Sequence, residues 1–173
     1  VKMKSSMIFL GLALLYSNLF SFAGGNGSTA DPWQIATPAH LEEVANYLGT
    51  IHSDKHFVLI NDIDLNSAPY NSGEGWLPIG NAGSQFAGKL DGNGFLIENL
   101  FIDRPTNWYI ALFGYTHSEA IISNLALVSV NITGYSWVGG LAGLNVGSIS
   151  NCSVVGDITG SSRTGGLVGR NLG

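Results

Sequence analysis

The stretch that decides the fold reads GGLAGLN at residues 139–145 and returns as GGLVGRN at residues 165–171, 26 positions later. Two earlier stretches share its central feature, an apolar-apolar-Gly triplet that ends at Gly88 and at Gly114. Counted from glycine to glycine through Gly143 and Gly169, the spacings are 26, 29 and 26 residues. Similarity at a nearly fixed period predicts stacked units, each too small to bury a core alone.

A second phrase, Ile-x-Asn, accompanies the triplets and ends at asparagines spaced 25 and 27 residues apart, namely Asn99, Asn124 and Asn151. Between the phrases, Val, Ile and Leu alternate with Ser, Thr and Asn, which is the pattern of β-strands. We therefore predict an all-β fold, a parallel β-solenoid (β-helix) whose coils stack about 4.8 Å apart.

Each ladder of this solenoid is expected to hold equivalent residues from successive coils. The expected core ladders are Leu112, Leu141 and Leu167, and Ile97, Ile122 and Ile149. The three asparagines are expected at one corner, where stacked amides can hydrogen-bond. The glycines expected at bends or close backbone approaches are Gly88, Gly114, Gly140, Gly143, Gly166 and Gly169. One residue is extra or missing between the last two copies, and a bulge can absorb it.

A short helix is predicted over residues 38–48, near the start of the repeats. Thr37 is suited to cap it, Pro38 to occupy its first position and Gly49 to end it. Its apolar stripe, which includes Leu41 and Val44, is expected to cover the first coil. The far end has no such lid, and exposed strand edges there favour end-to-end self-association.

The chain is predicted to begin with a signal peptide, residues 1–23. Lys2 and Lys4 precede an apolar run, and small residues suit cleavage after Ala23. A membrane anchor is the alternative, although the run is shorter than the roughly 20 residues that span a bilayer. The expected organisation is completed by a flexible lead-in over 24–30, an N-terminal cap with the first coils over 31–109, and repeats over 110–173, the last one truncated.

Charge and cysteine content argue against a nucleic-acid partner and against a fold supported by disulfides. The net charge is −5, and without residues 1–23 it is −7, from five cations and 12 acids. No basic patch is present, which argues against a nucleic-acid partner. Cys152 is the single cysteine, so no disulfide frame supports the fold, and it is expected to fill the apolar position held by Leu100 and Leu125 in the other copies.

The repeat resembles a known family. GGLAGLN at 139–145, followed by Gly147, Ile149, Asn151 and Cys152, is similar to the GLUG repeat of bacterial surface proteins, and residues 31–94 resemble the segment that precedes such repeats. The copy at Ile110–Gly114 departs from it, with no double glycine. The resemblance implies a secreted or surface-attached β-solenoid, often within large adhesin-like proteins. Some relatives carry an IgA-cleaving metallopeptidase domain elsewhere, but the repeat itself has no catalytic residue to transfer.

Searches for catalytic chemistry favour a non-enzymatic protein without cofactor or metal. None of the four histidines begins a His-Glu-x-x-His motif. An EF-hand loop starting at Asp62 fails at Ser67 and Gly73, although a looser calcium site stays open. The acids considered for polysaccharide cleavage are Asp62, Asp64, Asp91, Asp103 and Asp157, and the coil period brings no two of them together.

Aromatic residues supply the candidate ligand surface, which consists of Trp108, Tyr109, Tyr135 and Trp137. They precede successive triplets and could either stack as a sugar platform or simply pack on each other. The sequence therefore predicts an extracellular spacer or interaction surface at a bacterial cell surface, with a host or environmental glycan or surface protein as partner and no membrane contact after signal cleavage. A carbohydrate-binding or carbohydrate-active β-helix, and an accessory region of an IgA-type metallopeptidase, are the alternatives.

Overall fold

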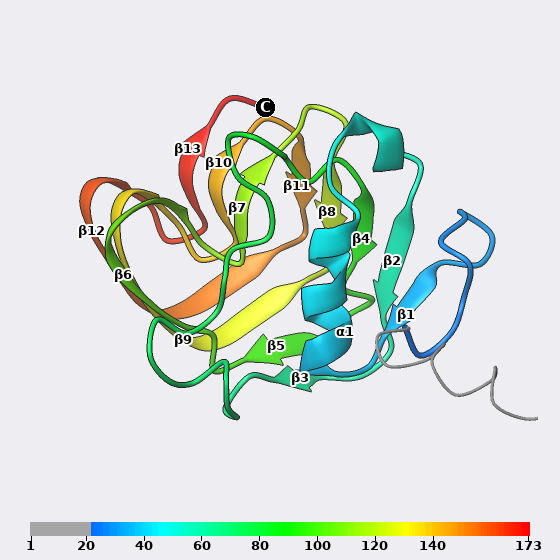
Figure 1. Cartoon of the computed structure of the whole chain (residues 1–173), viewed down its shortest axis with the longest axis horizontal. Helices are drawn as coiled ribbons and strands as arrows, with labels where there is room; N and C mark the ends of the chain where they lie inside the picture. The colour runs from blue at the N-terminus through cyan, green and yellow to red at the C-terminus, as the bar shows by residue number, and fades with distance from the viewer. Residues whose placement is uncertain (1–21) are drawn as a thin grey trace, which may run out of the picture.

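The computed structural model describes residues 22–173, so most of the expected signal peptide, residues 1–21, lies outside the described part. The chain winds as a parallel β-solenoid of about five turns whose strands form three sheets (Figure 1). Sheet A contains one strand from each turn, in the order β1 (Trp33–Ile35), β2 (His56–Leu59), β4 (Lys89–Asp91), β8 (Ile121–Ser123) and β11 (Ser148–Ser150). The predicted fold class is confirmed.

The other two sheets complete the circuit. Sheet B contains β3 (Ile63–Asp64), β5 (Leu96–Glu98), β9 (Ala126–Val138) and β12 (Ser153–Thr164), and β6 (Phe101–Ile110) also pairs with β9. Sheet C contains β7 (Phe113–Thr116), β10 (Ala142–Asn145) and β13 (Val168–Asn171). Every pairing between these strands is parallel.

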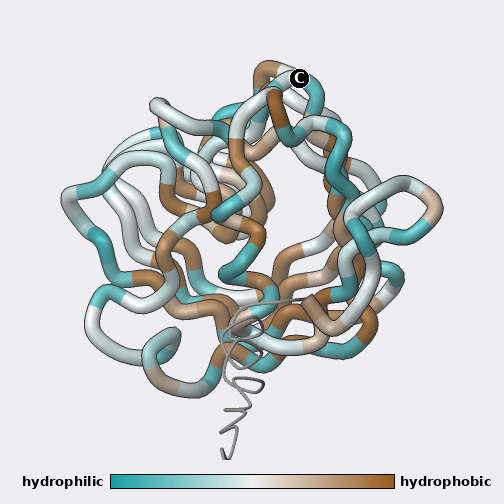
Figure 2. The backbone as a smooth tube through the Cα atoms, turned by 45° about the vertical axis from the view of Figure 1, so that its right-hand side comes forward, coloured by the Kyte–Doolittle hydropathy of each residue, from teal (hydrophilic) through white to brown (hydrophobic). Residues whose placement is uncertain are grey.

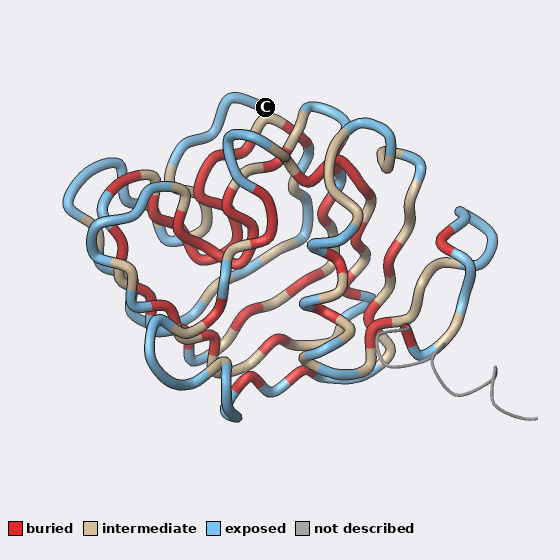
Figure 3. The backbone as a smooth tube through the Cα atoms, in the orientation of Figure 1, coloured by how far each residue is buried: buried red, intermediate tan, exposed pale blue. Residues whose placement is uncertain are grey.

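Apolar side chains fill the interior of the coils. Figure 2 shows hydrophobic segments on the inner side of the windings, and Figure 3 shows that the buried residues lie in the same place. In sheet A, Phe57, Leu90 and Ile122 lie side by side and are buried. Alternate residues of a strand point to opposite faces, so each short strand contributes one or two residues to this core.

The expected leucine ladder is present in sheet C. Register places Leu112, Leu141 and Leu167 beside one another, and the first two are fully buried. The Leu141 N–H donates to the Leu167 carbonyl at 3.0 Å. These contacts tie neighbouring coils together through both side chain and backbone.

A polar ladder runs beside the leucines. The Thr116 hydroxyl donates to Asn145 Oδ1 at 2.6 Å, and Asn145 Nδ2 donates to Asn171 Oδ1 at 2.7 Å. Asn145 Nδ2 also donates to the Gly147 carbonyl at 2.9 Å. Because Thr116 and Asn145 are buried, each bond satisfies a polar group that would otherwise lack a partner.

The helix forms where predicted but is shorter than expected. α1 spans Pro38–Glu43 and is followed by a 3-10 turn, η1 (Val44–Asn46). Thr37 caps it, because its hydroxyl accepts the His40 N–H at 3.3 Å. α1 lies across the first coils in Figure 1, and Leu41 of α1 and Val44 of η1 are fully buried in the common core. A second 3-10 turn, η2 (Thr50–His52), follows Gly49.

The start of the described chain differs from expectation. Residues 24–30 were predicted to be a flexible lead-in, but their backbone bonds to both neighbouring strands: Gln34 N–H donates to the Gly24 carbonyl at 2.9 Å, and His56 N–H donates to the Gly27 carbonyl at 3.0 Å. Phe22 is buried and its ring stacks on Trp33 with centroids 5.1 Å apart. Cleavage after Ala23 would therefore remove an aromatic side chain from the core.

Two apolar segments of the first coils do not form single strands. Over residues 57–65 the chain turns at residues 60–62, so that β2 belongs to sheet A and β3 to sheet B. Residues 76–79 form no strand, and Ile79 makes an isolated bridge to Phe113. Both segments contribute buried side chains to the core, whereas Leu77 is exposed; the buried ones are Phe57, Leu59, Ile63, Leu65, Trp76 and Ile79.

The expected isoleucine ladder is wrong at its first member. Ile122 and Ile149 are neighbours in sheet A, but their neighbour on the other side is Leu90. Ile97 lies in sheet B, between Ile63 and Leu127. The phrase Ile-x-Asn therefore recurs on two different walls of the solenoid.

The asparagine column is correct only for its last two members. Asn151 Nδ2 donates to Asn124 Oδ1 at 2.8 Å, as stacking predicts. Asn124 Nδ2 donates to Asp91 Oδ1 at 2.9 Å, and Asn99, at another corner, bonds Asp64 Oδ1 at 2.8 Å. All three asparagines have left-handed backbone, with φ between 52° and 58°, a conformation that asparagine tolerates.

Two further equivalences need correction. Register pairs Phe86 with Thr116, so Gly88 is not the partner of Gly114; that place belongs to Gly80, since Ile79 pairs with Phe113. Cys152 lies beside Leu125, as expected, but Leu100 lies next to Val130 instead. In both cases the first coils are longer than the repeats, which displaces their phrases from the later register.

The expected slip between the last two repeats is a bulge. Val155 pairs with Val128 and Gly156 with Val130, which leaves Ser129 without a partner in β12. Ser129 has left-handed backbone with φ 56°. Beyond the bulge, Ile158, Thr159 and Gly160 pair with the residues 26 positions earlier, as predicted.

Candidate functional site

The ends of β6, β9 and β12 build one corner of the solenoid from large side chains. Because Ile110, Val138 and Thr164 are in register, the residues before them, Tyr109, Trp137 and Arg163, also occupy equivalent places. All three have left-handed backbone, with φ of 62°, 53° and 49°. We call the group formed by Trp108, Tyr109, Tyr135, Trp137, Arg163 and Arg170 the aromatic corner.

The structure brings together the four aromatic residues that the sequence singled out. The Trp137 ring lies 4.6 Å from Tyr109 and 4.9 Å from Trp108, measured between centroids, and the Trp108 pair is edge-to-face. Tyr135 lies 5.8 Å from Trp108. Trp108 and Tyr135 are also exposed, by 46% and 43%. The cluster therefore packs on itself and still presents aromatic surface to solvent.

Two arginines that were not predicted from the sequence complete the corner. The guanidinium carbons of Arg163 and Arg170 each lie 5.8 Å from the centroid of the Trp137 ring, within the range of cation–π attraction. The period contained the signal, because Arg163 follows Trp137 by 26 residues. Below them, Tyr115 stacks on Tyr109 at 5.5 Å, and burial raises the pKa of the Tyr109 hydroxyl.

A second feature is a hollow of about 620 Å³ between α1 and the segment 69–79. Tyr70 donates its hydroxyl proton to Glu42 Oε2 at 2.8 Å across it. Burial and this carboxylate raise the pKa of Tyr70 to about 12, so the tyrosine stays a neutral donor near pH 7. The Trp76 indole N–H donates to the Leu112 carbonyl at 3.3 Å. These bonds fasten the lid to the coils.

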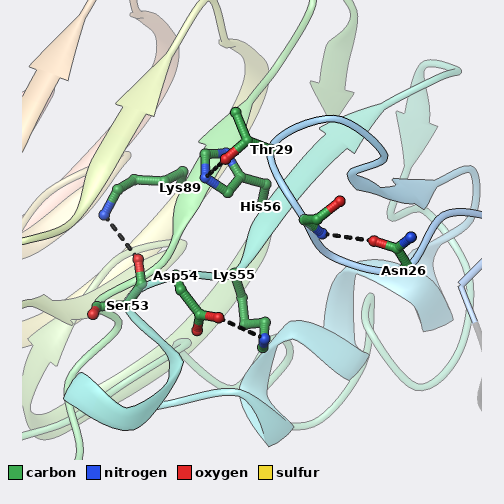
Figure 4. Close-up of polar contacts among 8 residues, drawn as sticks. Asn26, Thr29, Ser53, Asp54, Lys55, His56 and Lys89 are labelled. Atoms are coloured by element: carbon green, nitrogen blue, oxygen red, sulfur yellow. Dashed lines mark hydrogen bonds and ion pairs between the residues drawn. The ribbon is translucent and has the colours of Figure 1, made fainter.

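The outer face of sheet A carries a cluster of polar contacts near the first coil (Figure 4). Thr29 Oγ1 lies 3.0 Å from His56 Nε2, and Lys89 Nζ donates to the carbonyls of Ser53 at 3.0 Å and Glu119 at 2.6 Å. Burial and the nearby Lys89 charge lower the pKa of His56, which favours the neutral imidazole. Lys89 thus ties its own strand, β4, to the backbone at Ser53 and at Glu119.

Three of the acids considered for catalysis, Asp62, Asp64 and Asp91, accept hydrogen bonds within turns and from neighbouring coils. Asp62 Oδ1 accepts the Leu96 N–H at 2.8 Å, and Asp91 Oδ1 accepts the Asn93 N–H at 2.8 Å. The Asn99 amide and the Asn66 N–H hold the pKa of Asp64 below its usual value. Asp157 pairs with Asn131. Within residues 22–173, no three acidic, histidine or cysteine side chains are grouped as metal ligands, and no helix is long and apolar enough to span a bilayer.

Cys152 is expected to react slowly with thiol reagents. It is half-buried, its Sγ lies 3.2 Å from the Ser150 carbonyl, and burial raises the pKa of the thiol. Since the thiolate is the reactive form, alkylation by iodoacetamide at pH 7.5 should be at least about tenfold slower in the folded protein than in 8 M urea. Mass spectrometry of timed samples measures this. Equal rates in both conditions would show that the thiol is not shielded.

Comparison with known families agrees with the repeat. The family model described as "The GLUG motif" matches residues 134–159, which begin within β9 and end within β12. This stretch is a GLUG motif. The motif therefore includes the end of β9, all of β10 and β11, and the first part of β12. Leu141 and the buried Asn145 both lie within it.

Two relatives are similar in sequence to this chain over most of its length. A "Putative Gly-rich membrane protein" of Evansella cellulosilytica is 43% identical over 136 residues, which are 77% of this chain and 15% of that protein. Halomucin of Haloquadratum walsbyi is 37% identical over 135 residues, which are 76% of this chain and 1% of that protein. The chain thus spans only a small part of these relatives.

A solved structure also has a distant likeness. The crystal structure of "a putative immunoglobulin A1 protease from Bacteroides ovatus" superposes with a TM-score of 0.47 at 17% identity, covering 87% of this chain and 65% of that one. This likeness is too low to bear on what the GLUG-motif chain does.

Proposed function

We propose that the chain is a non-enzymatic, extracellular segment of a large adhesin-like surface protein, in which it acts as a rigid spacer with a lateral interaction surface. The observation that carries this proposal is the continuous stacking of coils. Leu112, Leu141 and the partly buried Leu167 form one column, and the bonded ladder of Thr116, Asn145 and Asn171 runs beside it. Such stacking makes a body whose length grows with each repeat.

The relatives support an envelope location. One is named a membrane protein and the other a halomucin, and the match covers only 15% of the first and 1% of the second. A repeat module within so long a chain fits a spacer better than a self-contained enzyme. Asp62, which accepts a backbone N–H from the next coil, and Asp91, which accepts one within its turn, also favour a structural use of the carboxylates.

Surface labelling tests the location. Antibodies raised against residues 24–173 are expected to stain intact native cells, and protease treatment of those cells should remove the signal. Staining only after permeabilisation would overturn the extracellular proposal.

A sugar-release assay tests the non-enzymatic part of the proposal. Incubation of the protein with plant and bacterial polysaccharides should release no reducing sugar. Release of sugar that is lost in Asp91→Asn would overturn this part.

Carbohydrate binding is a second candidate function, and the aromatic corner favours it. Aromatic rings offer wide apolar contact at small entropic cost, and Trp108 and Tyr135 present such surface to solvent. Contiguous exposed apolar groups on a soluble domain commonly mark interaction sites. The lateral surface of the proposed spacer would then include a glycan-binding site.

A further inference from the structure

We infer that the aromatic corner binds an acidic polysaccharide, a sugar polymer that carries carboxylate or sulfate groups, and this inference rests on the proposed carbohydrate-binding role. Three observations lead to it. They are the unpaired arginines, the local absence of acidic residues and the large side chains at left-handed positions. Together they give the corner both apolar faces and positive charge.

Arg163 and Arg170 have no carboxylate partner among residues 22–173. In the part of the chain that the structure describes, the ion pairs are Lys55 with Asp54 and Arg104 with Glu74. Arg163 and Arg170 are exposed and remain available. Guanidinium groups bind carboxylate and sulfate oxygens through paired hydrogen bonds, and stacking on an aromatic ring still leaves their edges free to donate.

The charge around the corner is opposite to that of the whole chain. The protein has a net charge of −5, yet residues 104–116, 134–145 and 158–173, which build the corner in three successive coils, contain no Asp or Glu. Asp103 and Asp157 lie just before two of these ranges, and Glu74 is engaged by Arg104, which leaves Arg163 and Arg170 as the charged groups at the Trp137 ring. An acidic ligand therefore meets a local positive site on a protein that otherwise repels it. Such an arrangement favours one orientation and one place of binding.

The backbone of the corner carries unusual side chains. Other left-handed corners hold Asn99, Asn124 and Asn151, the residue type that tolerates this conformation. Tyr109, Trp137 and Arg163 adopt it without that advantage, at a cost of about 1–2 kcal/mol each for L-residues. The Trp137 indole N–H is also covered and has no acceptor among residues 22–173. Strain of this kind is commonly retained where a side chain serves a site.

The shape of the site favours a polymer over a single sugar. Tyr109, Trp137 and Arg163 belong to three successive coils, whose strands lie about 4.8 Å apart. A chain laid along this column contacts all three coils at once. Each sugar contributes little alone, but contacts along one polymer act together and raise the affinity.

Binding measurements on immobilised polymers test the inference. The probes are polygalacturonate, neutral dextran and polyglutamate, the last being a polyanion without sugars. The wild-type chain should bind polygalacturonate and release it as NaCl rises from 50 to 500 mM, because salt screens exposed charges. Arg163→Gln with Arg170→Gln should weaken binding about tenfold or more. Lys55→Gln, a cation on another face, is the matched control and should leave binding unchanged.

A second variant tests the aromatic contribution without risk to the core. Trp108→Ala, at a side chain that is 46% exposed, should weaken polygalacturonate binding about three- to tenfold, whereas Leu77→Ala, 69% exposed at the lid, should not. Dextran binding as tight as polygalacturonate binding would overturn the acidic ligand but keep the carbohydrate role. Equal binding to polyglutamate, with Trp108→Ala unaffected, would overturn the sugar. Binding to no polymer would overturn both, whatever surface labelling shows.

Discussion

Replacing Gly114 with alanine is expected to destabilise the protein by about 3 kcal/mol or more, the upper range for overpacking in a tight interior. A methyl group there would overlap the Gly80 carbonyl oxygen and lie 2.9 Å from the Tyr109 carbonyl oxygen. Both are backbone atoms, so no side chain can move aside. Urea unfolding followed by circular dichroism measures the loss.

The chain provides a matched control for this change. Gly166 has ordinary backbone, and a methyl group added there would meet nothing within 4 Å. Gly166→Ala should therefore change stability by less than about 0.5 kcal/mol, or increase it slightly through the unfolded state. Equal destabilisation by both substitutions would show that close backbone contact is not the reason for glycine at position 114.

Leu141→Ala is expected to cost about 2–5 kcal/mol, the range for a buried leucine whose cavity cannot collapse. Leu141 is fully buried between Leu112 and Leu167, and its backbone is bonded to the next coil, so the space it leaves is held open. Thermal and urea unfolding should both report the change. The coils should unfold together, because each is buried by its neighbours.

Leu172→Ala is the control for the leucine ladder. Leu172 is 56% exposed, so its truncation should cost less than about 0.5 kcal/mol. A loss at Leu172 as large as that at Leu141 would contradict the assignment of the core. A loss at Leu141 below about 1 kcal/mol would do the same, because removing three buried heavy atoms from a ladder that cannot collapse should cost more than that.

The sequence predicted the later coils well because they repeat closely. The leucine ladder, the bulge beside Ser129 and the Thr37 cap were all read from spacing and residue type, and the structure contains them. The signal was strong because identical positions must stack. A one-residue slip would turn Leu141 toward solvent and Asp157 toward the core.

The errors have a physical cause in the corners. Asn99 and Asn124 share left-handed backbone but lie at different corners, so Ile-x-Asn marks a kind of turn and not a column. Gly88 was chosen over Gly80 because the first coils are longer, and the register is set there by isolated bridges. Pattern alone cannot separate two corners that demand the same conformation.

The arginines of the aromatic corner were missed for another reason. Arg163 follows the period of Tyr109 and Trp137, but a change from an aromatic to a charged residue hides the equivalence in a sequence. Arg170 reaches the same ring from sheet C, in register with Leu144 and Tyr115. A contact made from two separate sheets cannot be read from a single repeat.

Because Ser129 is left out of the pairing between β9 and β12, adjacent coils can differ by one residue while the walls on either side keep their partners. We therefore expect that gain or loss of one residue at Ser129 leaves Leu141 and Asn145 with the same neighbours. A gene built from such units can lengthen, shorten and recombine its copies with little penalty. The same tolerance makes the corner a natural place to graft a foreign peptide.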